Sequence, residues 1–398
     1  MKIAILILFI LVLVSSCHSG RDNSKGGLSD PANYHAPAPG KMSDSDFQQY
    51  HSAISSLMDS CLLRGNFNGG ILVAKNGEII YEKYQGWKDI QHPTDSLDEH
   101  SPLHLASTSK PFMSIAILSL VQENKLSLND SINKFFPEIP FPGITVAMLL
   151  SHRSGLPNYL YYMDHSDWDR KITATNADVL RILCRDKPEG GSPANKHFSY
   201  SNTNFVLLAM IVEKISGISY PEFMKQHFFD PIDMKDTYVV SGKDSLKATP
   251  SFTATGRRWD HDYLDGTYGD KNIYSTPRDL LKFDQALYSG QFIRPSLLDS
   301  AFIPQSNERK SVHNYGLGWR LQQLPNGKKV VYHFGKWHGC NAAFARLMDE
   351  KVTIIILGNR YTRTVYNAAH HCYGVFGAYD QKQEPDPEEG NEKQRQTP

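Results

Sequence analysis

Hydrophobic positions near the start of the chain follow first a helical and then a strand-like spacing. Behind Ser43, apolar residues recur every three to four positions, which predicts a helix to about Leu63. Two β-type runs follow at 70–75 and 78–82, joined by Asn-Gly, the dipeptide that most strongly favours a two-residue turn. The pattern therefore predicts a helix followed by a β-hairpin.

The rest of the chain passes from helices back to strands. A helix is predicted from Ser107 to about Glu123, and the segment from 129 to 270 consists mostly of helical patches and loops. Strand-like runs return only near the end of the chain, before a last helical pattern. The further predicted elements are helices at 145–150, 205–215 and 365–376, and strands at 329–333, 342–347 and 352–357.

Strands at both ends with helices between them define the expected fold class. We predict an α+β fold in which one antiparallel sheet, built from distant segments, is flanked by helices. The folded domain is expected to span 43–378, with an all-helical subdomain inserted within about 129–270.

Both ends of the chain lack the composition of a folded domain. An apolar run over 3–14 is too short to span a bilayer and is typical of the core of a secretory signal peptide. The segment 17–42 is rich in Gly, Pro, Ser and Asn, so we expect a flexible tether there. A disordered polar tail is expected over 379–398.

Composition and charge narrow the classes of function. The 398 residues are 40% hydrophobic and 21% charged, an ordinary globular balance for a chain that buries a sizeable core. Lysine plus arginine equals aspartate plus glutamate at 42 each, so we expect no nucleic-acid partner. The cysteines after residue 17 are too widely spaced to define a disulfide framework, and both disulfides and buried free thiols remain open.

Ser107 and Lys110 form a Ser-x-x-Lys pattern at the start of a predicted helix. Residues three apart lie on one face of a helix, so the amine would lie beside the hydroxyl. A serine hydroxyl becomes a strong nucleophile when a neighbouring base takes its proton, and a desolvated lysine is such a base. The pattern alone is weak because both residue types are common, and its meaning depends on residues further along the chain.

Two downstream clusters supply further groups for acyl transfer. The phenol of Tyr200, next to a lysine amine, could relay a proton to a leaving group, and the Asn202 amide could orient the lysine or a substrate. Gly335 would let a substrate lie against a strand edge, where a free backbone N–H stabilises an oxyanion. Taken singly, Tyr200 and His333 are equally consistent with ordinary packing.

Taken in order, these clusters resemble the motifs of the serine β-lactamase and penicillin-binding family. The resemblance covers about 47–376, and its nearest branches are class C β-lactamases, D-alanyl-D-alanine carboxypeptidases, D-aminopeptidases and related esterases. It implies a serine hydrolase that forms an acyl-enzyme and needs neither metal nor organic cofactor. The three motifs are Ser107-x-x-Lys110, Tyr200-x-Asn202 and His333-x-Gly335, and the similar accessory blocks are 149–156, 274–280 and 315–319.

The resemblance also implies a role for each residue. Ser107 would be the acylated nucleophile, Lys110 its proton acceptor and Tyr200 the general acid and base. The backbone N–H groups of Ser107 and Lys336 would form the oxyanion hole, and Asn202 would orient the lysine and the substrate. The expected substrate-binding residues are Asn202, His333, Gly335 and Lys336.

The third motif departs from that of class C β-lactamases, which has Lys and Thr where this chain has His333 and Phe334. A lysine holds an anionic substrate with a fixed charge, whereas an unperturbed histidine is largely neutral near about pH 7. Phe334 also lacks a hydroxyl. We therefore expect hydrolysis of a peptide, amide or ester, such as a D-amino-acid peptide or cell-wall fragment. A β-lactamase and a non-hydrolytic penicillin- or peptidoglycan-sensing domain are the alternatives.

Two groups of histidine and cysteine have side chains that suit zinc. One overlaps the third motif, and the adjacent histidines of the other would point to different faces of a helix, so we expect no metal site. The groups are His333, His338 and Cys340, and His370, His371 and Cys372.

The stretch that ends at Cys17 resembles the lipobox of bacterial lipoproteins, whose cysteine is lipidated and becomes the new N-terminus. We therefore expect a signal peptide over 1–16 and a lipid anchor on Cys17. The protein would then act in the bacterial cell envelope, on its periplasmic or extracellular side. A plain signal peptide with an incidental cysteine is the alternative.

Overall fold

The computed structural model describes residues 35–241 and 248–379, so the expected signal peptide, Cys17 and nearly all of the expected tail lie outside the described residues. The first expected helix is present as α1 (Asp44–Met58), which a π-helical turn extends to Leu63. It begins at Ser43, whose hydroxyl accepts a hydrogen bond from the Asp46 N–H. In the described ranges no helix is long and apolar enough to cross a membrane.

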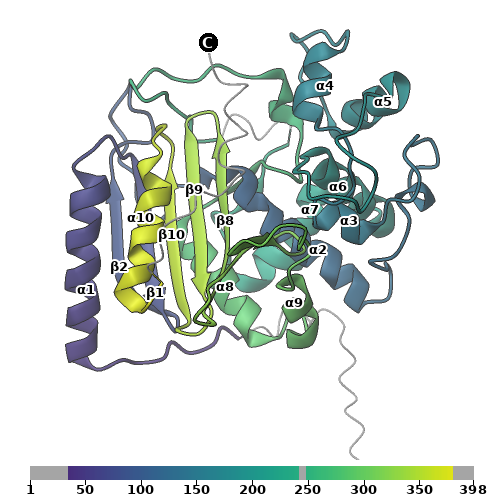
Figure 1. Ribbon diagram of the computed structural model, residues 1–398. Helices are drawn as coiled ribbons and strands as arrows, with labels where there is room; N and C mark the ends of the chain where they lie inside the picture. Colours follow the sequence, from purple (N-terminus) through teal and green to yellow (C-terminus); the bar gives the residue numbers. More distant parts are fainter. Residues whose placement is uncertain (1–34, 242–247, 380–398) are drawn as a thin grey trace, which may run out of the picture.

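A seven-stranded sheet in the order β2-β1-β10-β9-β8-β7-β6 forms the centre of the fold. Its strands pair antiparallel, and β1 from the start of the chain lies beside β10 from its end (Figure 1). The predicted sheet of distant segments is therefore confirmed. The strands are β1 (Gly69–Lys75), β2 (Glu78–Gln85), β6 (His313–Tyr315), β7 (Arg320–Gln323), β8 (Lys329–Trp337), β9 (Cys340–Leu347) and β10 (Val352–Gly358).

Alternate residues of the central strands face two separate cores. Ile354 and Ile356 of β10 face α1 and α10 (Thr364–Tyr373), whereas Ile355 and Leu357 face the opposite side. On that side lie α2 (Lys110–Gln122), α8 (Pro277–Ser289) and α9 (Pro295–Ala301) (Figure 1). The near-continuous apolar sequence of β10 follows from this burial on both faces.

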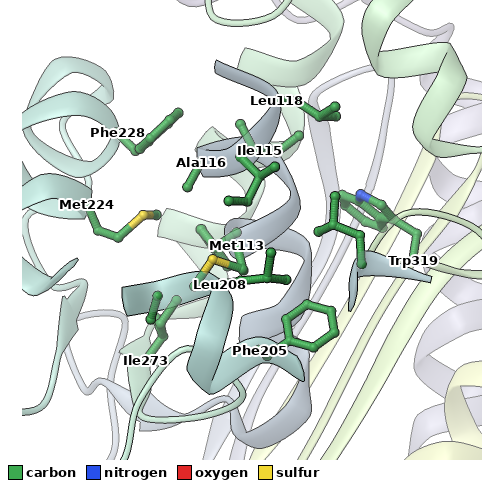
Figure 2. Packing of buried hydrophobic residues seen from close by; sticks show 14 of the residues in the cluster. Met113, Ile115, Ala116, Leu118, Phe205, Leu208, Met224, Phe228, Ile273 and Trp319 are labelled. Atoms are coloured by element: carbon green, nitrogen blue, oxygen red, sulfur yellow. The ribbon is translucent and has the colours of Figure 1, made fainter. Parts of the chain in front are cut away.

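Helix α2 runs through the middle of the larger core. Every residue of α2 except Val121 is buried, and Figure 2 shows its Met113, Ile115, Ala116 and Leu118 side chains among those of neighbouring elements. A helix that is apolar on all sides needs such surroundings. Its first residue is Lys110, so this packing fixes the base of the expected Ser-Lys pair.

The helix begins later than the sequence predicted. Residues Ala106–Ser109 form a 3₁₀ turn, and regular α-helix starts at Lys110. Pro111 explains the boundary, because proline lacks a backbone N–H and is tolerated in the first turn of a helix. Ser107 therefore lies in a tight turn that leads into α2.

The segment between 129 and 270 carries helices, as expected, but also part of a second sheet. In this small sheet β5 (Ile273–Ser275) pairs with β3 (Leu103–His104) and with β4 (Tyr238–Val239), none of which the hydrophobic pattern predicted. Cys61, Cys184, Cys340 and Cys372 are free. The helices are α3 (Val146–Leu150), α4 (Tyr159–His165), α5 (Asn176–Asp186), α6 (Thr203–Ser216) and α7 (Tyr220–Met224).

Candidate active site

The hydroxyl of Ser107 lies between an amine and a phenol. Lys110 Nζ donates a hydrogen bond to Ser107 Oγ at 2.9 Å, and Tyr200 Oη donates to the same oxygen at 3.0 Å. Side chains at i and i+3 eclipse one another in a 3₁₀ turn, which explains the Ser-Lys contact. The structure thus brings together the three residues predicted to carry catalysis.

Lys110 is fully buried at the first turn of α2. Besides Ser107, its amine donates to the backbone carbonyl of Asp270 at 2.9 Å and lies 5.0 Å from the ring centroid of Tyr200. A hydroxyl and a carbonyl accept a hydrogen bond from either the charged or the neutral amine. These contacts are therefore compatible with an amine that gains and loses a proton during the reaction.

Asn202 lies beside the site but does not orient Lys110 as expected. Its side-chain oxygen is buried and, among the described residues, has no hydrogen-bond partner. The Asp270 carbonyl, just before β5, binds the amine of Lys110 in its place. An amide with an unmet hydrogen bond remains suited to binding substrate, as the sequence predicted.

The second half of β8 has a free edge beside Ser107. Strand β7 pairs with β8 only as far as Arg320 and Tyr332, so the part from His333 to Trp337 has no strand on that side in the described chain. A Cβ on Gly335 would lie 2.3 Å from the Leu105 carbonyl oxygen and 2.8 Å from the Ser107 nitrogen. Only glycine allows this approach, which brings the main chain before Lys336 against the turn of Ser107.

His333 is fully buried and faces a tyrosine. Its Nδ1 lies 2.8 Å from the Phe334 carbonyl, which can only accept, so Nδ1 donates. In the neutral ring Nε2 then carries no proton and accepts from Tyr315 Oη at 3.0 Å. Burial, with the charges of Arg320 and Lys110, holds the pKa of His333 well below its usual value. The ring is therefore neutral and bonded to Tyr315, and contact of His333 with substrate stays a prediction.

Phe334 points away from Ser107, to the opposite face of the sheet. Its ring packs beneath α10 and stacks on Tyr366, with centroids 5.4 Å apart and 22° between the ring planes. Successive strand residues face opposite sides, so a hydroxyl at this place would not point toward the site. Of the two departures in the third motif, only the missing lysine alters the charge around the site.

Arg320, which the sequence analysis missed, brings a positive charge to that region. Its guanidinium carbon lies 5.5 Å from the ring centroid of Tyr200, at the point where β7 ends and the free edge of β8 begins. The only sequence signal was its place directly after the block 315–319. A cation beside Tyr200 therefore comes from the neighbouring strand instead of the first position of the third motif.

Asp265, also missed, fixes the end of β8. Its Oδ1 accepts from Trp337 Nε1 at 2.8 Å and is 2.9 Å from His338 Nε2. Although burial opposes ionisation, the bonds from these two residues help to lower the pKa of Asp265 to about 2.

Within the described ranges, no group of three or more histidine, cysteine or acidic side chains could hold a metal ion.

The fold and this constellation together define a class: serine hydrolases with the β-lactamase and penicillin-binding fold. A family model described as Beta-lactamase matches residues 53–371, and the chain belongs to this family. The predicted resemblance is confirmed, and so are the α+β fold class and the assignment as a serine hydrolase.

Three known proteins illustrate the similarity. Penicillin-binding protein 4* of Bacillus subtilis (strain 168) is 33% identical over 361 residues, which are 85% of this chain and 79% of that protein. The match to the next curated relatives covers less of each protein, 62% and 65% of their length. A penicillin-binding protein from Bacillus halodurans shares the fold with a TM-score of 0.71 and 21% identity, over 81% of this chain and 99% of that one. For a D-amino acid amidase from Ochrobactrum anthropi SV3 the TM-score is 0.69 and the identity 21%, over 82% and 98%.

Proposed function

We propose that this serine hydrolase cleaves a peptide or amide bond of a D-amino-acid peptide or cell-wall fragment through an acyl-enzyme on Ser107. One observation carries the proposal: Ser107 Oγ accepts hydrogen bonds from both Lys110 Nζ and Tyr200 Oη. A nucleophile with a proton acceptor and a proton donor at hydrogen-bond distance has the groups that two-step acyl transfer needs.

In the first step Ser107 Oγ attacks the substrate carbonyl carbon while its proton passes to Lys110. The negative oxygen that forms is stabilised by the backbone N–H groups of Ser107 and Lys336. Tyr200 gives its proton to the leaving amine, which departs as the acyl-enzyme forms, and recovers a proton from Lys110. Water then attacks the ester, with the same groups acting in reverse, and releases the acid and free Ser107.

The surroundings of Ser107 favour a substrate with a free carboxylate on its leaving side. The free edge of β8 at 333–337 lies in line with β7. An extended peptide bound along this edge, antiparallel to β8, would have its C-terminal end near Arg320. A guanidinium pairs well with a carboxylate. A structural neighbour, a D-amino acid amidase, agrees by name with a D-amino-acid substrate.

We further propose that the protein works in the bacterial cell envelope, held by a lipid on Cys17. The apolar run over 3–14 and the lipobox-like stretch before Cys17 support this location. Metabolic labelling with a fatty-acid probe tests it. Label on the wild-type chain that is absent from Cys17→Ala is expected, and equal labelling of both chains would contradict the anchor.

A hydrolysis panel tests the substrate. It compares nitrocefin, p-nitrophenyl esters, a D-Ala-D-Ala peptide and the matched L-Ala-L-Ala peptide, each with the wild type and with Ser107→Ala. We expect turnover of the D-peptide above the L-peptide and nitrocefin, all lost in Ser107→Ala. A preference for nitrocefin would identify a β-lactamase. Ser107-dependent labelling by penicillin without turnover of any substrate would identify a sensing domain.

A further inference from the structure

His152 lies against Tyr200 but takes no part in the steps described above. It follows α3 with a backbone φ of 55°, in the left-handed region that a non-glycine residue occupies at a cost. Its carbonyl accepts a hydrogen bond from the Ser199 N–H at 2.8 Å, which ties it to the segment that carries Tyr200. Such a conformation, held in place by its surroundings, is typical of a residue with a specific task.

The ring of His152 is fully buried and stacks on Tyr200. The two centroids are 4.1 Å apart, with 29° between the ring planes. Tyr315 lies edge to face with the same imidazole at 4.9 Å, and its hydroxyl is bound to His333. The aromatic contacts thus join the third motif, through Tyr315 and His152, to the phenol that bonds Ser107.

The polar edge of the same ring holds the main chain next to Tyr200. Nδ1 accepts from the Ser201 N–H at 3.1 Å and lies 3.3 Å from the side-chain nitrogen of Asn204. A ring nitrogen that accepts carries no proton, so the proton of the neutral ring is on Nε2. Nε2 is buried and has no hydrogen-bond partner in the described part of the chain.

The surroundings of this ring keep it uncharged. Burial, with nearby Lys110 on α2, His333 on β8 and Arg320 on β7, lowers the pKa of His152 well below its usual value. A protonated ring would also lose the acceptor that binds the Ser201 N–H. The geometry and the charges therefore require the same neutral tautomer.

We propose that His152 is a positioning residue that keeps the Tyr200 phenol on Ser107 Oγ, through its stacked ring and its Nδ1 bond to the Ser201 N–H. Phenylalanine would supply the flat face without the acceptor, and asparagine an acceptor without the ring. The inference rests on the acyl-enzyme chemistry of Ser107 and is independent of which substrate the enzyme cleaves.

The rate at which a fluorophosphonate labels Ser107 tests the proposal in the wild type, His152→Asn and His152→Phe. Asparagine tolerates positive φ, so the first variant keeps the backbone unstrained. We expect labelling to slow about 10²-fold in both variants, because a small misplacement of a reacting group has effects of that size. With a p-nitrophenyl ester, kcat should fall while KM stays near the wild-type value, and the thermal midpoint identifies folded variants.

Wild-type labelling of Ser107 with equally fast labelling of a folded His152→Asn would overturn the inference. If the wild type itself does not label at Ser107, the proposed acyl-enzyme function fails instead. If neither variant folds, ¹⁵N NMR of the wild-type imidazoles decides. At about pH 6.5, the usual histidine pKa, we expect His152 in the neutral Nε2–H form, whereas an Nδ1–H form or a substantial cationic fraction contradicts it.

Discussion

Two buried cations of this protein are held in different ways. Arg346 on β9 donates to the carboxylate of Asp284 on α8, which also accepts from Thr353. Lys110, equally buried, donates to a serine hydroxyl and to a backbone carbonyl. Burial opposes the charge of Arg346, yet Asp284 raises the pKa of Arg346 above its usual value. The charge of Arg346 is balanced by a carboxylate, whereas the hydroxyl and the carbonyl that bind Lys110 accept from its amine with or without its charge.

The largest effect is expected when Lys110 can no longer give up its proton. Lys110→Arg keeps a positive charge, but a guanidinium does not deprotonate in proteins. We expect fluorophosphonate labelling of Ser107 to fall about 10³-fold, within the range of a lost general base, while folding is retained. Rates within a few-fold of the wild type in folded protein would contradict the role of Lys110 as proton acceptor.

Breaking the Arg346–Asp284 pair should affect stability instead of chemistry. Arg346→Met leaves Asp284 buried without its cation, and the free energy of unfolding should fall by about 3–5 kcal/mol. Urea unfolding measures the loss, and labelling per folded molecule should be unchanged. The double variant Arg346→Met with Asp284→Leu is the matched control and should recover most of the stability. If Arg346→Met had normal stability but labelled slowly at Ser107, the pair would serve catalysis instead of stability, and this prediction would be wrong.

His104 differs from both buried cations, because it is a titratable side chain that is buried in its uncharged form. Burial lowers its pKa to about 4, against about 6.5 for an unfolded histidine. Below about pH 6.5 the unfolded chain binds a proton that the folded chain does not, so stability is full above that pH. It should decline by about 3 kcal/mol as the pH falls to about 4. Urea unfolding at several pH values should show a shallower decline for His104→Asn, and an unchanged decline would contradict the assignment.

The smallest effect is expected from Phe334, on the face of β8 away from the site. Phe334→Leu should cost about 1 kcal/mol of unfolding free energy, because a buried ring is replaced by a smaller apolar group. Ester hydrolysis and nitrocefin turnover should remain within about two-fold of the wild type, since the face toward Ser107 is unaltered. A ten-fold change in either rate would show that this residue does shape the site.

The sequence predicted what depends on neighbours along the chain. The hairpin of β1 and β2 follows from an Asn-Gly turn, the start of α1 from the cap of Ser43, and the Ser107–Lys110 contact from a separation of three residues. The family motifs added Tyr200 and the strand of Gly335. These features need only local geometry, or an ordered set of residues that resembles a known site.

What the sequence missed depends on contacts between distant segments. The neutral state of His333 requires burial behind Tyr315, and the charge near Tyr200 comes from Arg320 at the end of another strand. The side-chain oxygen of Asn202 does not bind Lys110, whose amine donates instead to the carbonyl of Asp270, 160 residues away. No local pattern of spacing specifies such partners.

The most direct test of the central claim is the mass of the labelled protein and the site of its label. After reaction with a fluorophosphonate, intact-protein and peptide mass spectrometry should place one adduct on Ser107. The adduct should form about 10²-fold more slowly in Tyr200→Phe and be absent from Ser107→Ala. An adduct on another residue, or equal labelling of Ser107→Ala, would contradict the account of Ser107 as the nucleophile.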